Sequence, residues 1–261
     1  MRQNERTKSH AGLLSAAGGL ALLLAAWHVV CAAGVFNSYV LPSPGAVLAA
    51  GRKMLQSGEL ARDVLVSLTR VMRGFSIAFA LAFLLGAVSL LFPRAGSMYR
   101  YPVHFFRFVP PLSLIPLLIL WCGIHETTKT AIIVLASFFP IYLSIIKGFT
   151  GVDPRLLEVG RAFGYDKRAS FLRITLPAAL ADVLVGMRTG LGYAWRAIIG
   201  AEMVAASTGL GHMILFAQQT SRTDKVIVGI FVIGLVGLLC DRLFALAVRL
   251  LFRGIAGTGW D

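Results

Sequence analysis

Residues 153–177 read DPRLLEVGRAFGYDKRASFLRITLP and form the longest polar interruption between apolar segments in the second half of the chain. The stretch has the punctuation of two short helices. Asp153 is a favourable N-cap, and the proline after it occupies the first helical position, where its missing N–H costs no hydrogen bond. Gly164 can adopt the left-handed conformation that ends this first helix. Asp166 would cap a second helix, which Pro177 is expected to end.

The first of these helices is amphipathic. Its charged side chains lie away from an apolar face formed by Leu156, Leu157, Gly160 and Phe163. A short structured element between apolar runs needs a surface against which this face is buried. We therefore interpret the stretch as a docking site for a partner protein.

The composition of the chain is that of an integral membrane protein. Of its 261 residues, 57% are hydrophobic and only 14% are charged, and the mean hydropathy is +0.77. The apolar runs are too long and too uniform for the strands of a barrel, so the predicted fold class is all-α, with membrane lipid as a partner. The net charge of +13 would suggest nucleic acid for a soluble protein, but basic cytoplasmic loops explain it here, and we expect no nucleic-acid partner.

Six apolar segments approach or exceed the length of about 20 residues that spans a bilayer core. They are 11–35, 64–92, 102–124, 130–149, 180–204 and 226–251. The first follows a basic start, like a signal peptide. Its apolar stretch exceeds the roughly 7–15 residues of such a peptide and no convincing cleavage site follows, so we expect a retained span. Ser43 is placed to cap a short interfacial helix from Pro44 to about Gly58.

The third predicted span is interrupted by several prolines. In a membrane helix, prolines are tolerated where neighbouring helices or cavity water satisfy the carbonyl groups that they leave without a donor. A span broken so often is typical of a helix that lines a pathway rather than one that faces lipid. The candidate pathway residues from this span are Pro110, Pro111 and Pro116.

Six spans would place both termini on one side of the membrane. Lys and Arg are more frequent on the segments that share this side than on the opposite segments. The positive-inside rule therefore predicts that both termini, and with them residues 153–177, face the cytoplasm.

Catalytic and metal-binding motifs are absent from the sequence. There is no GxxxxGK[ST] phosphate loop, no HExxH and no GxSxG, and the five histidines lack the spacing of metal ligands. The three cysteines all lie in apolar runs and form no pairing framework. We expect a protein that is not an enzyme and that binds no metal or cofactor itself.

Three ionisable residues, Arg188, Arg196 and Glu202, fall in the fifth span. A charge inside the membrane is costly unless it is paired or hydrated, which makes each a candidate functional residue. The two arginines lie within about 80° of each other around a helix, so both could face one cavity and favour an anionic substrate. The alternative is that Arg188 extends to the cytoplasmic surface, that Glu202 extends to the outer surface and that Arg196 forms a structural ion pair.

The cytoplasmic stretch resembles the EAA loop of the permease subunits of bacterial ATP-binding-cassette (ABC) importers. That pattern is E-A-A, three residues, G, nine residues, I, one residue, L-P. Here Glu158 opens the pattern, and the remaining matches are Gly164, Ile174, Leu176 and Pro177. The chain departs from the pattern at the two alanines, which are replaced by Val159 and Gly160.

The resemblance extends over residues 40–250 and is strongest to the nitrate, sulfonate, taurine and bicarbonate branch of these permeases. Its further pieces include LPSP (41–44), SLTRVMRGF (67–75), RFVPPLSLIPLLILWCGI (107–124), FFPIYL (138–143), GLGYAW (190–195), GLGHMI (209–214) and VIGLVGLLCDRL (232–243).

This resemblance implies a type I ABC permease fold, in which the EAA loop is a coupling helix. It implies an N-terminal span and periplasmic segment over 1–63, a permease domain over 64–251 and a cytoplasmic tail over 252–261. The implied location is the bacterial inner membrane. The implied partners are a second permease copy, two cytoplasmic ATPase subunits that use ATP and Mg, and a periplasmic or lipid-anchored solute-binding protein.

Other classes of function fit the sequence less well. A secondary transporter or channel that works without ATP would be expected to show carboxylates in the middle of a span or inverted repeats, and neither is evident. An intramembrane enzyme would need a nucleophile, base or metal constellation. A purely structural subunit would leave the proline-rich third span without an explanation.

Overall fold

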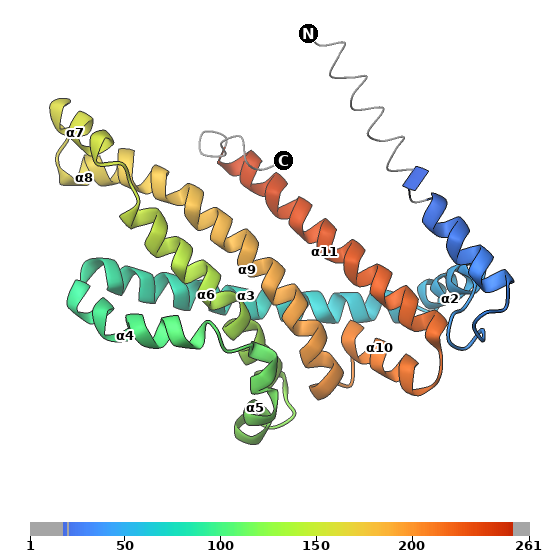
Figure 1. Cartoon of the computed structure of the whole chain (residues 1–261). Coiled ribbons are helices and arrows are strands. Elements are labelled where there is room, and N and C mark those ends of the chain that lie inside the picture. The colour runs from blue at the N-terminus through green and yellow to red at the C-terminus, as the bar shows by residue number, and fades with distance from the viewer. Residues whose placement is uncertain (1–17, 20, 253–261) are drawn as a thin grey trace, which may run out of the picture. The chain divides into compact units, whose positions relative to one another are not determined.

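A computed structural model describes residues 18–19 and 21–252, and the described chain is helical throughout, without strands (Figure 1). A short helix covers Ala21–Ala32. The elements that follow are α2 (Pro44–Gln56), α3 (Glu59–Leu91), α4 (Pro93–Phe106), η1 (Pro111–Leu114), α5 (Ile115–Cys122), α6 (Glu126–Thr150), α7 (Pro154–Ala162), α8 (Lys167–Ser170), η2 (Phe171–Thr175), α9 (Leu176–Ala205), α10 (Leu210–Gln219) and α11 (Thr223–Leu251).

Four helices within the described residues are long and apolar enough to cross a membrane. They are α3, α6, the continuous helix Lys167–Ala205 and α11. They confirm four of the predicted spans. Three of them begin three to five residues before the predicted start, whereas the helix that contains the span 180–204 begins at Lys167, thirteen residues before it. The first part of the predicted span 11–35 lies outside the described residues, and Ala21–Ala32 is its helical remainder. The total of six spans stays a prediction.

The third span, predicted over 102–124 and broken by prolines, consists of two helical segments. Pro93 begins α4, nine residues before the predicted start of the span, and α4 is bent by 91° from the segment Pro111–Cys122. The break lies at Pro110, whose backbone is extended. Two adjacent prolines remove two N–H donors and exclude the preceding residue from helical geometry, so one straight helix cannot pass through them.

The interfacial helix expected after Ser43 is present as α2. The Ser43 hydroxyl accepts a hydrogen bond from the Ala46 amide at 3.3 Å, and Pro44 occupies the first turn. The chain divides into two compact units, and α2 belongs to the smaller one, which comprises the residues up to Ala61 together with Met213–Val232. Within this unit, Lys225 binds Glu59 at 2.9 Å.

The larger unit comprises Arg62–His212 together with the residues from Ile233 onward. Its core lies where α3, α6 and α9 meet, and the residues that form it are Phe75, Ala78, Ala82, Ile141, Tyr142, Ile145 and Val183. Glycines let these helices approach closely. A methyl group added at Gly148 of α6 would lie 2.7 Å from the Ala179 carbonyl oxygen, and one at Gly190 of α9 would lie 2.7 Å from Ile141 Cγ1. Small residues at helix contacts are typical of membrane proteins, where association relies on close packing.

Replacing Gly190 with valine is therefore expected to destabilise the protein by about 1–3 kcal/mol, because the added side chain overpacks the contact with α6. Gly234→Val is the matched control, since an added Cβ at Gly234 of α11 meets nothing within 4 Å. Thermal unfolding in detergent would compare the two variants. Equal stabilities would show that the close α6–α9 contact contributes nothing to folding.

Candidate functional site

A cleft of about 510 Å³ lies in the larger unit, beside the bend after α4. Its walls come from residues 107–112 and from α6 and α9. The lining side chains are mainly apolar, but they include two arginines and no carboxylate. They are Arg107, Phe108, Val109, Pro110, Pro111, Leu112, Leu135, Ala136, Phe139, Pro140, Leu143, Tyr193, Arg196 and Ala197.

The candidate pathway prolines divide between the cleft and its surroundings. Pro110 and Pro111 line the cleft at the bend. Pro116 lies in the first turn of α5, is exposed, and is not among the lining residues. The bend therefore brings Arg107, Pro110 and Pro111 to the cleft, whereas Pro116 lies outside it in the first turn of α5.

The Arg196 guanidinium lies 4.8 Å from the centre of the Tyr193 ring, and its Nε donates a hydrogen bond to the Gly192 carbonyl at 3.1 Å. No carboxylate in the described part of the chain forms an ion pair with it. Arg107 is similar, since its guanidinium lies 4.6 Å from the centre of the Phe108 ring. Two guanidinium groups beside apolar walls favour an oxyanion, which they can bind with paired N–H donors.

Arg188 is paired with a carboxylate instead. Its Nε and Nη2 both donate to Asp241 of α11, each at 2.6 Å. It lines a smaller pocket of about 200 Å³, which Arg196 also borders. The two arginines of α9 thus share this pocket, but only Arg196 reaches the larger cleft. Arg188 therefore forms a bidentate ion pair with α11, which the alternative of an arginine that extends to the cytoplasmic surface did not include.

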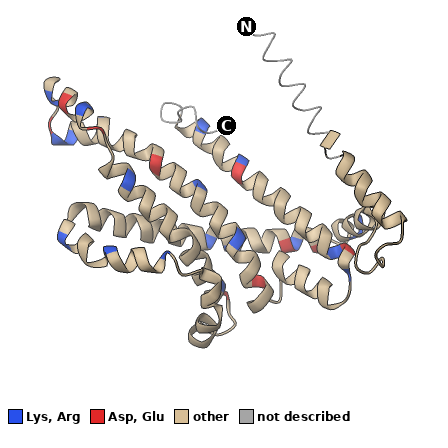
Figure 2. Ribbon diagram, viewed as in Figure 1, with Lys and Arg blue, Asp and Glu red and all other residues tan. Residues whose placement is uncertain are grey.

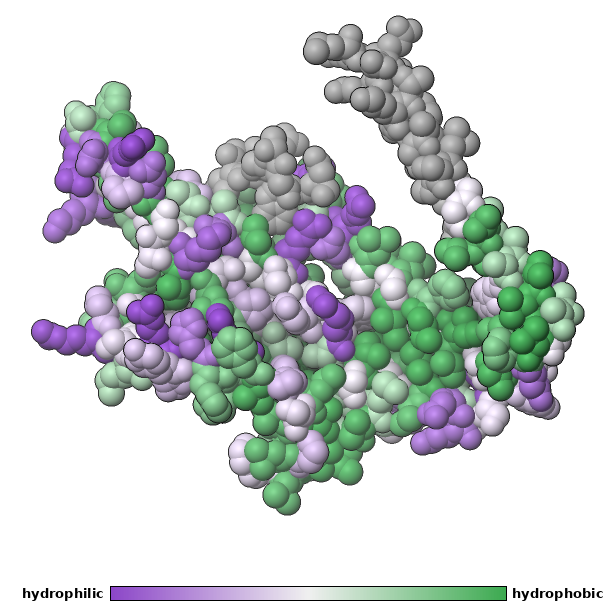
Figure 3. Space-filling model, in the orientation of Figure 1, coloured by the Kyte–Doolittle hydropathy of each residue, from purple (hydrophilic) through white to green (hydrophobic). Residues whose placement is uncertain are grey.

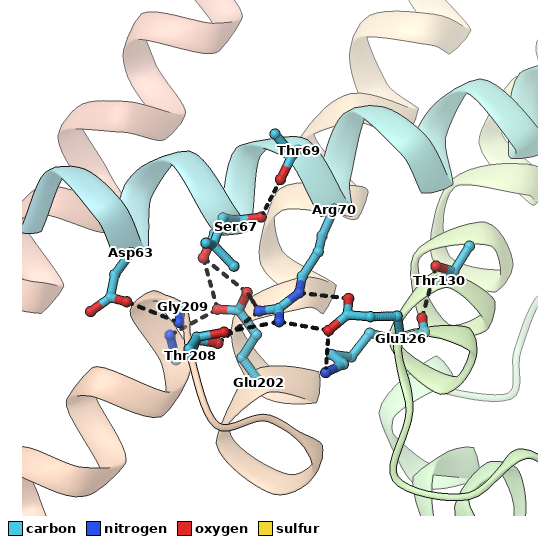
Figure 4. Close-up of polar contacts among 12 residues, drawn as sticks. Asp63, Ser67, Thr69, Arg70, Glu126, Thr130, Glu202, Thr208 and Gly209 are labelled. Atoms are coloured by element: carbon cyan, nitrogen blue, oxygen red, sulfur yellow. Dashed lines mark hydrogen bonds and ion pairs between the residues drawn. The ribbon is translucent and has the colours of Figure 1, made fainter.

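The alternative that the Glu202 side chain extends to the outer surface is wrong. Glu202 is 0% exposed, and its carboxylate accepts a hydrogen bond from Arg70 Nη1 at 2.8 Å (Figure 4). The sequence did not reveal this pair, because Arg70 and Glu202 lie 132 positions apart in the chain.

The polar stretch 153–177 forms the end of the hairpin between α6 and α9, and charged residues are frequent there (Figures 1 and 2). The predicted caps are present. Asp153 accepts a hydrogen bond from the Arg155 amide at 2.9 Å, and Asp166 accepts one from the Ala169 amide at 2.7 Å. Gly164 ends α7 with a φ of 75°, as its left-handed role requires.

The apolar face of α7 divides into a buried and an exposed part. Gly160 is buried against Ile174 of η2, whose Cδ1 would lie 2.5 Å from an added Cβ. Leu156 and Phe163 are 48% and 76% exposed. Apolar surface accordingly appears among the polar atoms at this end of the molecule (Figure 3). Leu157 is half-buried and Glu158 is exposed.

Pro177 does not end the second helix, contrary to the prediction. Helical structure is continuous from Lys167 to Ala205, and Pro177 lies in the first turn of α9 after the half-buried Leu176. Five residues before it, Phe171–Thr175, form a π-helical turn. A π turn alters the hydrogen-bond pattern locally, so the helix continues past a residue that lacks an N–H donor.

No group of three or more His, Cys, Asp or Glu side chains within the described ranges is arranged to hold a metal ion. The arginine-lined cleft and the exposed end of α7 are therefore the two candidate sites.

Comparison with known proteins places the chain in a family. Residues 78–253 match the family described as "Binding-protein-dependent transport system inner membrane component". A putative aliphatic sulfonates transport permease protein of Bacillus subtilis is 36% identical over 89% of this chain and 84% of its own length. The taurine transport system permease protein of Escherichia coli is 32% identical over 93% of this chain and 88% of its own.

Solved structures share the fold at low sequence identity. An amino acid ABC transporter chain matches with a TM-score of 0.62 and 13% identity, over 77% of this chain and 96% of its own. A chain of the MetNI methionine ABC transporter, in an inward-facing conformation, matches with a TM-score of 0.55 over 72% and 97%. The chain therefore belongs to the family of binding-protein-dependent transport system inner membrane components, as a multi-pass permease subunit of the inner membrane.

Proposed function

We propose that this permease forms the pathway by which a small oxyanion, such as a sulfonate, taurine or nitrate, enters the cell. The observation that supports this substrate class most is the pair of arginines in a cleft that no carboxylate lines. The relatives carry names for aliphatic sulfonates, taurine and nitrate transport, whose substrates all present a compact group of negatively charged oxygens.

The energy for transport would come from two separate ATPase subunits that use ATP and Mg. We assign docking to the segment of residues 153–177, with Leu156, Leu157, Glu158, Gly160, Phe163, Gly164, Ile174, Leu176 and Pro177 as its residues. Leu156 and Phe163 are exposed and available to be covered by a partner, whereas Gly160 and Ile174 hold α7 against η2. An ATP-independent transporter would have no use for such a surface.

A single helix would carry the motion of the ATPase to the cleft. Helical structure continues from Lys167, beside the docking surface, to Ala205, and Arg196 lies on this helix. At 1.5 Å per residue it is a rod of roughly 58 Å. A displacement of α7 is transmitted along this rod, which fits a rigid-body switch between inward- and outward-facing states.

The remaining partners complete the assembly. A second copy of this chain would form the other half of the pathway, and a solute-binding protein would deliver the solute from outside. Much of α11 leaves apolar side chains exposed, a surface suited to lipid or to the second copy. We divide the chain into an N-terminal region (1–63), a permease domain (64–251) and a cytoplasmic tail (252–261).

Gly164→Leu is expected to reduce uptake at least tenfold, because the strained exit from α7 would move the docking surface. Gly58→Leu is its matched control, since Gly58 has a φ of 73° against 75° at Gly164, and an added Cβ meets nothing within 4 Å at either position. Uptake by cells with equal amounts of inserted protein would be measured. Equal uptake by the two variants would contradict the docking role.

Glu158→Lys is expected to reduce co-purification of the ATPase subunits while the chain still inserts, because it reverses the charge at an exposed position of α7. Co-purification at wild-type levels, together with normal uptake, would remove Glu158 from the docking surface.

Arg196→Gln is expected to slow uptake of a labelled alkanesulfonate at least tenfold while sparing ATPase binding, since a hydrogen bond to a charged group contributes about 1.5–3 kcal/mol. Arg94→Gln removes the same charge from an exposed position on α4, outside the cleft, and serves as the control. An unchanged uptake rate for Arg196→Gln would return this residue to a structural role.

A further inference from the structure

Three side chains of α3 contact the backbone of the turn between α9 and α10. Asp63, Ser67 and Arg70 are spaced by four and three residues, so they share one face of the helix. Together with Glu202 they bind four consecutive residues of the turn (Figure 4). Arg70 donates to the Thr208 carbonyl (2.7 Å), Asp63 accepts from the Gly209 amide (3.2 Å), Ser67 accepts from the Leu210 amide (3.0 Å), and Glu202 accepts from the Gly211 amide (3.0 Å).

Glu202 is the centre of this arrangement. Its buried carboxylate accepts hydrogen bonds from the Ser67 hydroxyl at 2.8 and 2.9 Å and from Arg70 at 2.8 Å. The turn is shaped around it: Gly209 has a φ of 109°, and a methyl group at Gly211 would lie 2.7 Å from Glu202 Cβ. The carboxylate also accepts from the Gly211 amide in the first turn of α10, where negative charge is favoured.

Arg70 connects a further helix to the same point. Its Nε and Nη2 donate to the Glu126 carboxylate at the start of α6, at 2.8 and 2.7 Å. Lys129, only 4% exposed, binds the same carboxylate at 2.7 Å. One guanidinium thus joins α3 to the first residue of α6, to the last turns of α9 and to the turn itself.

The arrangement lies next to the cleft. Gly200, two residues before Glu202, packs against Leu112, which lines the cleft. Arg196 and Ala197, both cleft residues, lie within two turns of Glu202 on the same helix. Holding Glu202 therefore fixes the rotation of the part of α9 that presents Arg196.

We propose that Arg70 and Glu202 are positioning residues for transport, which set the conformation of residues 208–211 and the rotation of the end of α9. They touch no substrate and act through the backbone that they bind. The link to uptake rests on the proposed function, whereas the effect on the turn does not depend on it.

The test distinguishes a positioning role from a contribution to stability alone. A buried ion pair can often be replaced by apolar residues of similar size without loss of stability, so the double variant Arg70→Met/Glu202→Leu keeps volume in the core while removing the bonds to the turn. Amide hydrogen exchange of the full chain in nanodiscs is expected to be at least tenfold faster at residues 209–211, and uptake by the assembled transporter at least tenfold slower.

Arg73→Met is the matched control, because Arg73 lies one turn further along α3 and is exposed. Its exchange rates and uptake should equal those of the wild type. If the double variant does not fold, Ser67→Ala gives the same answer on a smaller scale, with exchange at Leu210 expected to rise at least tenfold.

Wild-type exchange at 209–211 in the folded double variant, or at Leu210 in Ser67→Ala, would overturn the proposal. So would faster exchange with unchanged uptake, since the turn would then be dispensable for transport. Failure of the oxyanion assignment is recognised separately. The wild-type protein would then take up no alkanesulfonate, and ATP turnover stimulated by the binding protein would replace uptake as the measure of transport. A lower ATP turnover in the double variant would still support the positioning role.

Discussion

Between α6 and α9, glycines remove the side chains that would otherwise hold two helices apart. In a bilayer the lipid is as apolar as the helix surfaces, so helices associate through close contact and polar bonds rather than through the hydrophobic effect. Gly148 and Gly190 provide that contact along the pair. This contact also positions the cleft, because the lining residues outside 107–112 all lie on α6 and α9.

The charges in the larger unit are stabilised in three different ways. Arg188 has a bidentate carboxylate partner on α11, and Glu202 has a guanidinium and a hydroxyl from α3. Among the described residues, Arg196 contacts an aromatic face and a backbone carbonyl of its own helix. Burial of a charge requires compensation, and Arg188 and Glu202 each have an oppositely charged partner that provides it. Arg196 lines the cleft together with Arg107, and neither guanidinium has a carboxylate partner among the described residues.

Local signals in the sequence predicted a large part of this structure. The caps at Asp153 and Asp166 and the left-handed Gly164 depend on residues within a few positions of each other, and all three are present. Apolar length predicted the helices α3, α6, α9 and α11. The docking role of α7 remains a prediction, although the structure gives a reason why Gly160 replaces an alanine, since it packs directly against Ile174. What the sequence could not supply was the partner of Glu202, because that depends on which helices meet in space. The prolines at 110 and 111 indicated a break in the third span, but not its angle of 91°.

The π turn at Phe171–Thr175 has a consequence for how the two ends of the long helix are related. A π turn corresponds to one residue inserted into an α-helix, and each α-helical residue turns the chain by about 100°. The π turn therefore sets how far the cleft end, which carries Arg196, is rotated about the helix axis relative to the docking end, where Gly160 packs against Ile174. A one-residue deletion there would leave a regular, equally apolar helix, yet it would rotate one end against the other by more than a quarter of a circle. The continuous helix can thus transmit a displacement, while the π turn sets the direction in which Arg196 faces relative to the docking end.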